Sequence, residues 1–397
     1  MISLKLLFWV ISLKLSFWVI LQTTQMWNKL RSGLGTIALL SLAFTLYKLS
    51  KRKRKYKDIT SLIGNTPLIE ITSLSSASGC TILAKAEFLN MGGSPKDRLA
   101  LGIILHAEAQ GLLKRGRGDV IFEGTVGSTG ISLATVSKAL GYNCHIIMPD
   151  DQAKEKYALL EKLGACVEKV RPASIVDPLH FVNLARQRAL DLNALDPSPD
   201  TPKGYFCNQF ENLANLEVHY QTTGPEIYRQ TNGHLDAIVL GAGTGGTLAG
   251  VAKYLKPRIP QLKVVLADPQ GSGLYHKVKH GVLYSQTDAE GSRKRHQVDT
   301  IVEGIGLNRL VQNFKYAFDQ GWIHDAVQVS DQEAVEMSRY LLKKDGIFVG
   351  SSSAVNCAAA YKLAKRLGPG HTILTILCDH GSRHLTKFWY FPRNAHS

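Results

Sequence analysis

Residues 237–255, AIVLGAGTGGTLAGVAKYL, lead from an apolar run through a glycine-rich turn into a second apolar segment. Ala237–Leu240 predicts a short buried strand, and Leu248–Leu255 predicts a helix. The glycines allow a tight turn and bring backbone N–H groups close to an anion, and the helix N-terminus adds about half a positive charge. The segment therefore predicts a strand–loop–helix unit of an α/β fold whose loop binds phosphate. A tight structural turn is the alternative.

The same alternation of strands and helices extends in both directions from this segment, beginning at Asp58. It predicts parallel sheets covered by helices on both faces. The expected strands are Val120–Glu123, Cys144–Met148, Ala237–Leu240, Val264–Ala267 and Thr372–Leu377. The expected helices include Ile131–Leu140, Lys154–Leu163, Leu248–Leu255 and Asp331–Lys344. Ligands of such folds collect where strand ends meet helix N-termini, so the loops at these points are candidate sites.

The first loop also satisfies the pattern GxGxxG through Gly241, Gly243 and Gly246, and Asp268 follows 22 residues later. This spacing is that of a dinucleotide-binding fingerprint, so an NAD-dependent dehydrogenase is one alternative. Thr244 supplies a hydroxyl donor that fits a phosphate group equally well. The choice between a dinucleotide site and a phosphate site therefore depends on the other loops.

Two further Gly/Ser/Thr-rich loops precede expected helices, at 123–134 and 350–354. In the first, Thr125, Ser128 and Thr129 could hold a carboxylate or a cofactor oxygen. Helix N-capping is the alternative for both loops.

The segment 90–98, NMGGSPKDR, places Lys96 behind a Gly-Gly-Ser turn at the start of an expected helix. Desolvation and the positive helix end would lower the pKa of such a lysine and favour the free amine that a Schiff base needs. A solvated lysine is the alternative for this residue taken alone.

The formal net charge of the 397-residue chain is +15, and it is unevenly distributed. Residues 1–60 hold eleven Lys/Arg and one acidic residue, whereas the rest of the chain has a balance of only +5. We therefore expect no nucleic-acid binding. The six cysteines include no CxxC pair and no metal-ligand spacing, so we expect no metal site and a reducing compartment.

The N-terminal arm, residues 1–57, predicts a membrane anchor and a basic flank. Its apolar run 33–47 lies at the short end for a membrane-spanning helix, and KRKRK at 51–55 would stay cytoplasmic. We expect an uncleaved anchor in the mitochondrial outer membrane, with the core facing the cytosol. The endoplasmic reticulum membrane, a cleaved transit peptide, a surface amphipathic helix and a translation start at Met26 are the alternatives.

Seven motifs occur in one order within residues 58–390: GNTPL (64–68), GGSPKDR (92–98), TVGSTG (125–130), TTGPEI (222–227), GTGGT (243–247), EGIG (303–306) and GSSSA (350–354). This series resembles the pyridoxal-phosphate-dependent cysteine synthases, or O-acetylserine sulfhydrylases, and their cystathionine β-synthase relatives. The anchor and CDHGSRHLTKFW (378–389) are most similar to fungal cysteine synthase-like proteins of the mitochondrial outer membrane.

The resemblance implies a two-lobed α/β fold of the fold type II pyridoxal-phosphate enzymes, similar to the tryptophan synthase β subunit. The catalytic core would span 58–397, with a smaller lobe at roughly 90–205 and a larger lobe in the remainder. A homodimer is also implied.

The resemblance further implies roles for individual residues. Lys96 matches the Schiff-base lysine, which would also remove the α-proton of the substrate. The matches to the cofactor site are Ser128, Gly243, Thr244, Gly245, Gly246, Thr247 and Ser352, with Ser351 in place of Ser352 if the register slips. The matches to the substrate-carboxylate site are Thr125, Thr129 and Gln209.

A serine facing the pyridine nitrogen makes the cofactor a weaker electron sink than an aspartate would, which favours elimination of a β-leaving group. The implied reaction is therefore β-replacement, in which O-acetylserine and sulfide give cysteine through an aminoacrylate intermediate. Condensation with homocysteine to cystathionine is the alternative.

Two residues depart from the family pattern. Ser128 stands where an asparagine usually contacts the cofactor's ring hydroxyl, and Val126 replaces a commonly polar residue. The Ser128 hydroxyl is shorter than an asparagine amide, and Val126 has no hydrogen-bond donor. A protein that binds the cofactor but is only weakly active, and that serves as a membrane scaffold, is therefore a further alternative. The dehydrogenase alternative gives Lys96 no role.

Overall fold

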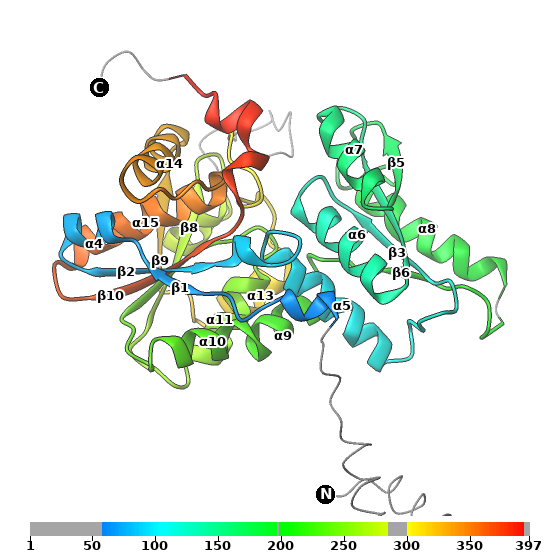
Figure 1. Cartoon of the computed structure of the whole chain (residues 1–397), viewed down its shortest axis with the longest axis horizontal. Helices are drawn as coiled ribbons and strands as arrows, with labels where there is room; N and C mark the ends of the chain where they lie inside the picture. Colours follow the sequence, from blue (N-terminus) through cyan, green and yellow to red (C-terminus); the bar gives the residue numbers. More distant parts are fainter. Residues whose placement is uncertain (1–57, 197, 285–299, 393–397) are drawn as a thin grey trace, which may run out of the picture. The chain divides into compact units, whose positions relative to one another are not determined.

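The apolar run Ala237–Leu240 forms β7 (Ala237–Gly241) in the computed structural model, which describes residues 58–196, 198–284 and 300–392. β7 lies in a six-stranded sheet with the order β1-β2-β10-β7-β8-β9 (Figure 1). Its neighbours are β1 (Leu68–Glu70), β2 (Thr81–Ala86), β8 (Lys263–Pro269), β9 (Asp325–Val329) and β10 (Thr372–Leu377). The strands pair in parallel, as expected, except that β1 is antiparallel to β2.

Consecutive side chains of β7 enter two different apolar cores, because side chains alternate along a strand. Val239 packs in the core formed with α4, α14 and α15, whereas Ile238 and Leu240 pack in the core formed with α9, α10, α11 and α13. Figure 1 shows α14 and α15 on one side of the sheet and α9 to α11 on the other. These helices are α4 (Thr72–Ser78), α9 (Ala214–Gln221), α10 (Thr223–Gln230), α11 (Gly246–Leu255), α13 (Gln312–Asp319), α14 (Asp331–Asp345) and α15 (Ser351–Leu367), with α12 (Leu274–His280) beside β8 and β9.

A second sheet of four parallel strands has the order β5-β4-β3-β6. Its strands are β3 (Val120–Gly124), β4 (Asn143–Pro149), β5 (Cys166–Val170) and β6 (Gly204–Phe206). Ile121 packs with α5 (Lys96–Ala109), α6 (Ser128–Leu140) and α7 (Lys154–Lys162), whereas Phe122 packs with α8 (Phe181–Leu195). The expected strands and helices are thus confirmed to within a few residues, and the limits of the two lobes stay a prediction.

A buried cluster of charges connects two of the sequence motifs, 92–98 and 222–227, near the start of α5. Arg98 donates to both carboxylate oxygens of Glu226, at 2.7 and 2.8 Å, and to both oxygens of Glu87, at 2.8 Å. Lys85 lies 2.7 Å from Glu226. Burial raises the pKa of Glu226, but the hydrogen bonds and charge of Arg98 outweigh it and bring the value to about 2. Because Arg98 lies in the first turn of α5, the cluster fixes the start of this helix, at Lys96.

Short helical turns complete the described chain: η1 (Ile59–Leu62), η2 (Glu87–Leu89), η3 (Gly381–Arg383) and the π-turn η4 (Leu385–Trp389). The predicted anchor, with its apolar run 33–47, lies outside the described residues. Among the residues that the structure describes, no helix has both the length and the apolar character to cross a membrane.

Candidate active site

Lys96 is the first residue of α5, and the turn before it is held by side chains from other parts of the chain. Asp97 accepts the N–H of Gly92 at 2.7 Å and the hydroxyl of Ser132, from α6, at 2.5 Å. The guanidinium of Arg383, in η3, donates to the carbonyl of Gly92. The position of Lys96 is therefore set by contacts with α6 and with the C-terminal segment.

The Lys96 side chain is half-buried, and its environment favours the neutral amine. Burial lowers its pKa, while the nearby Cys378 and Asp379 act in the opposite direction without reversing the shift. A neutral amine is the form required both to make a Schiff base and to accept a proton.

Cys378 lies directly after β10 and connects Lys96 with the turn at the start of α15. Burial raises the pKa of its thiol to about 11 and the charge of Asp379 acts in the same direction, while a hydrogen bond with the Ser352 hydroxyl acts to lower it. Ser352 is 5% exposed and Ser351 is fully buried. The Ser351 hydroxyl is engaged elsewhere, by the N–H of Glu303. Cys378 thus interacts with both Ser352 and Lys96, whereas the Ser351 hydroxyl is engaged by Glu303.

The loop between β7 and α11 presents backbone donors at the N-terminus of the helix. Gly245 has φ +81°, a backbone conformation that would be strained in a residue with a side chain. Within the described ranges, none of the backbone N–H groups from Gly243 to Thr247 has a hydrogen-bond partner. Free N–H groups at a helix N-terminus attract an anion. This loop, with its two threonine hydroxyls, fits the phosphate of pyridoxal phosphate.

Two side chains of α9 support this loop. Asn215 donates to the hydroxyl of Thr244 at 2.9 Å, and the His219 ring lies between the hydroxyls of Thr247, at 3.1 Å, and Thr223, at 2.8 Å. Burial lowers the pKa of His219 to about 3, and the positive charge of Arg98 contributes to this shift. His219 therefore stays neutral and connects Thr247, in the 243–247 loop, with Thr223.

The candidate substrate residues form a second group that is linked to the first. The Thr129 hydroxyl donates to Oε1 of Gln209 at 2.6 Å, and the carbonyl of Gln209 accepts from Asn215 at 3.0 Å. Thr125 is buried, 6% exposed, at the end of β3. Ser128 is half-exposed, and its hydroxyl has no hydrogen-bond partner among the described residues. The structure therefore connects Thr129 and Gln209 with Thr244, but it does not connect Ser128.

Sequence reasoning missed Asn215, His219 and Asp97. A signal was present for two of them, because residues 215, 219 and 223 are spaced by four and so share one face of a helical segment. Polar residues on a face that must be buried indicate hydrogen-bonding partners. The partners themselves could not be predicted, since Thr244 lies 29 residues from Asn215.

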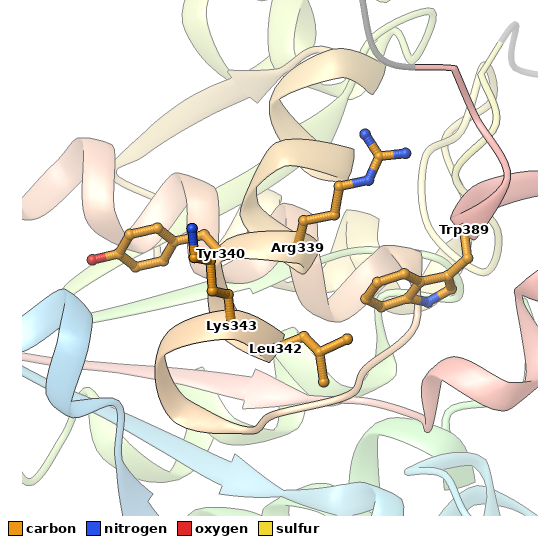
Figure 2. Close-up of a pocket in the computed structure, with 5 residues that line it drawn as sticks. All are labelled: Arg339, Tyr340, Leu342, Lys343 and Trp389. Atoms are coloured by element: carbon orange, nitrogen blue, oxygen red, sulfur yellow. The ribbon is translucent and has the colours of Figure 1, made fainter. Parts of the chain in front are cut away.

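Asp268, which suggested a dinucleotide site, is fully buried and accepts the N–H of Tyr275 at 2.7 Å. It is therefore not free to bind a ribose. A surface pocket of about 520 Å³ also lies away from the predicted residues, and its lining comes from α14 and the C-terminal segment (Figure 2). None of the candidate site residues lines this pocket.

Comparisons with known proteins agree with this arrangement. The model of the family described as "Pyridoxal-phosphate dependent enzyme" matches residues 59–379. A protein named cysteine synthase 2 from Neurospora crassa is 60% identical over 334 residues, which cover 83% of this chain and 72% of the relative. A Saccharomyces cerevisiae protein with the provisional name of mitochondrial cysteine synthase is 54% identical, over 87% of this chain and 88% of the relative.

A solved structure of O-ureido-L-serine synthase is also similar. Its TM-score is 0.70 at 30% sequence identity, and the alignment covers 86% of this chain and 97% of that one.

Proposed function

Because the chain belongs to the pyridoxal-phosphate dependent enzyme family, we propose that it is a cysteine synthase, which converts O-acetylserine and sulfide into cysteine and acetate. The observation that carries the proposal is that Cys378 interacts with both Lys96 and Ser352, while the N–H groups at 243–247 have no hydrogen-bond partner among the described residues. The relatives named cysteine synthase, at 60% and 54% identity, support sulfide over homocysteine as the second substrate.

In this proposal, Lys96 would hold the cofactor aldehyde through Nζ, the loop 243–247 would hold its phosphate, and Ser352 would face its ring nitrogen. Bound pyridoxal phosphate supplies an electron sink for the substrate's α-carbon. The Lys96 amine, kept neutral by burial, then takes the α-proton at Nζ. Removal of that proton allows acetate to leave from the β-carbon, to which sulfide adds.

Thr125, Thr129 and Gln209 orient the substrate carboxylate in the same proposal. The bond from Thr129 fixes the orientation of the Gln209 amide, whose side chain also forms a hydrogen bond with Glu123. Ser128 contacts the ring hydroxyl of the cofactor, and its half-exposed position leaves room for a bridging water.

The location and assembly of the protein are proposed on other grounds. The apolar run 33–47 and the basic run 51–55 support an anchor in the mitochondrial outer membrane with the core facing the cytosol. The name of the yeast relative supports mitochondria. We also propose a smaller lobe at roughly 90–205 and a homodimer.

The test records the visible absorbance of the purified full-length chain with bound pyridoxal phosphate, before and after O-acetylserine and then sulfide. The proposal expects a change on adding O-acetylserine, recovery on adding sulfide, and release of cysteine. Lys96→Ala should abolish all three. Cofactor binding without any response to O-acetylserine would reject cysteine synthesis and favour the scaffold alternative, and recovery with homocysteine alone would favour cystathionine synthesis.

A further inference from the structure

Three buried polar side chains form a chain of hydrogen bonds behind the Ser352 turn. Ser351 Oγ lies 3.3 Å from Nδ1 of His384, and Nε2 of His384 lies 2.9 Å from Oδ2 of Asp379. Ser351 is fully buried, and His384 and Asp379 are each 7% exposed. They come from the start of α15, from the residue after η3 and from the segment after β10. Burying three such groups is costly unless each is paired, so their arrangement requires an explanation.

The direction of these bonds follows from the tautomer of His384. A carboxylate oxygen only accepts, so Nε2 of His384 carries the hydrogen that Asp379 accepts. In the tautomer that carries its hydrogen on Nε2, Nδ1 is the acceptor, and the Ser351 hydroxyl donates to it. The oxygen of Ser351 is left to accept the N–H of Glu303, at 2.9 Å. The Asp379–His384 pair therefore determines where the Ser351 hydrogen points.

The same pair also holds the backbone of the turn. The N–H of Gly350 donates to the carbonyl of Asp379 at 3.0 Å. A Cβ at Gly350 would lie 2.2 Å from Oδ1 of Asp379 and 2.5 Å from Nε2 of His384, so only glycine fits there. The backbone before Ser352 is thus packed directly on His384 and Asp379.

The chain extends from this turn to the phosphate loop through Glu303. Gly306, in the same EGIG segment, donates its N–H to the carbonyl of Ala242 at 2.9 Å. A Cβ at Gly243 would lie 2.1 Å from the carbonyl oxygen of Gly304. One set of contacts therefore links the two parts of the site that would hold the ring and the phosphate.

A Ser–His–Asp chain also suggests a hydrolase triad, but the geometry excludes a nucleophilic Ser351. Its side chain is fully buried, and its oxygen already accepts from the backbone of Glu303. A nucleophile must be reachable by its substrate.

We propose that His384 is a positioning residue: together with Asp379 it orients Ser351, and through the turn Gly350–Ser352 it sets the position of the Ser352 hydroxyl against the cofactor ring. This inference rests on the proposed function, which assigns Ser352 to the ring nitrogen. The proposal gives the segment 378–384, CDHGSRH, a role that is separate from those of Lys96 and the loop 243–247.

The experiment compares H384Q and H384N with S351A and S352A in the full-length protein loaded with pyridoxal phosphate. A glutamine amide reaches toward Asp379 but offers Ser351 no acceptor at the Nδ1 position, whereas an asparagine oxygen lies near that position. We expect H384Q and S351A to shift the visible absorbance maximum of the bound cofactor in the same direction as S352A. We also expect about a tenfold loss of cofactor affinity, with H384N closer to the wild type.

The double variant S351A/H384Q should show no larger effect than either single change, because both break one bond. Ser382→Ala is the matched control. It removes the contact of 2.9 Å between the Ser382 hydroxyl and Nδ1 of His380, which is exposed and does not involve Gly350, Ser351 or Ser352. It should leave the absorbance and the affinity unchanged. S351A removes a single oxygen atom, so it decides the question if the His384 variants do not fold.

A purely structural role predicts a different result: a lower melting temperature with an unchanged cofactor spectrum and cofactor affinity. That result would overturn the proposal. The absorbance comparison needs bound cofactor but no turnover, so inactivity toward O-acetylserine would reject the proposed function and leave the test of His384 intact.

Discussion

The side-chain nitrogen of Asn215 donates to the hydroxyl oxygen of Thr244 at 2.9 Å and so determines which way the Thr244 hydrogen points. Since Thr244 accepts this bond, its own hydrogen is left to donate to an anion in the phosphate loop. The same nitrogen also donates to the carbonyl of Gln209 at 3.0 Å. One amide thus joins the proposed phosphate and substrate residues.

Asn215→Asp should therefore weaken cofactor binding by about tenfold or more. A carboxylate cannot donate to Thr244, so the Thr244 hydroxyl would instead donate to the carboxylate. It could then no longer donate to the phosphate of the cofactor. Titration of the cofactor-free protein with pyridoxal phosphate measures the effect. Asn193→Asp is the control, because among the described residues the side chain of Asn193 bonds the backbone of Gly204 alone. Equal affinities in the wild type and Asn215→Asp would show that Thr244 does not donate to the phosphate.

Lys96→Ala should lower the turnover of O-acetylserine by at least about 10³-fold, because it removes both the covalent attachment and the base. The phosphate loop is untouched by this change, so pyridoxal phosphate should still bind but should be removed by dialysis. Lys114→Ala, at a lysine whose side chain is 66% exposed, should change neither property. Turnover of Lys96→Ala near that of the wild type would assign the base to another residue.

The positions of the strands and helices could be predicted from the sequence because they depend on local patterns. In β7, Ile238 and Val239 face opposite cores, and such a doubly buried strand has a continuous apolar run that is visible in the sequence. Lys96 could likewise be placed at a helix start from the Gly-Gly-Ser turn before it.

The contacts that support the site could not be predicted, because each joins residues far apart in the chain. Arg98 and Glu226 are separated by 128 residues, and Ser351 and His384 by 33. The choice between Ser351 and Ser352 illustrates the limit. The sequence alone does not show which of two adjacent serines faces a ligand. Only their burial and their different hydrogen-bond partners distinguish them.

Glu123 should make the protein less stable as the pH rises from about 4.5 to about 8. Burial raises the pKa of this carboxyl to about 8, although backbone N–H groups of the Gln209 segment oppose the shift. Between those values the folded state keeps the proton and the unfolded state has lost it. The free energy of unfolding should therefore fall, by up to about 1.4 kcal/mol per pH unit from this group, and level off above pH 8.

Glu123→Gln should lack this component, since glutamine does not titrate. Chemical denaturation of both proteins at pH 5, 6, 7 and 8 measures the difference, in which the titration of all other groups cancels. Glu161→Gln, at an exposed position on α7, serves as the control. A constant difference across the four pH values would mean that Glu123 is ionised in the folded protein.

Arg98→Met should destabilise the folded protein by about 3–5 kcal/mol, because it leaves Glu87 and Glu226 buried without their main partner. The methionine keeps much of the volume, so the cost comes from the uncompensated carboxylates rather than from a cavity. Arg115→Ala is the matched control: it breaks an Arg–Glu pair of 2.6 Å whose arginine side chain is 49% exposed, and it should cost no more than about 1 kcal/mol. Chemical denaturation at pH 7 compares the two variants. A similar, small cost for both would show that Lys85 alone compensates Glu226, and that the cluster does not depend on Arg98.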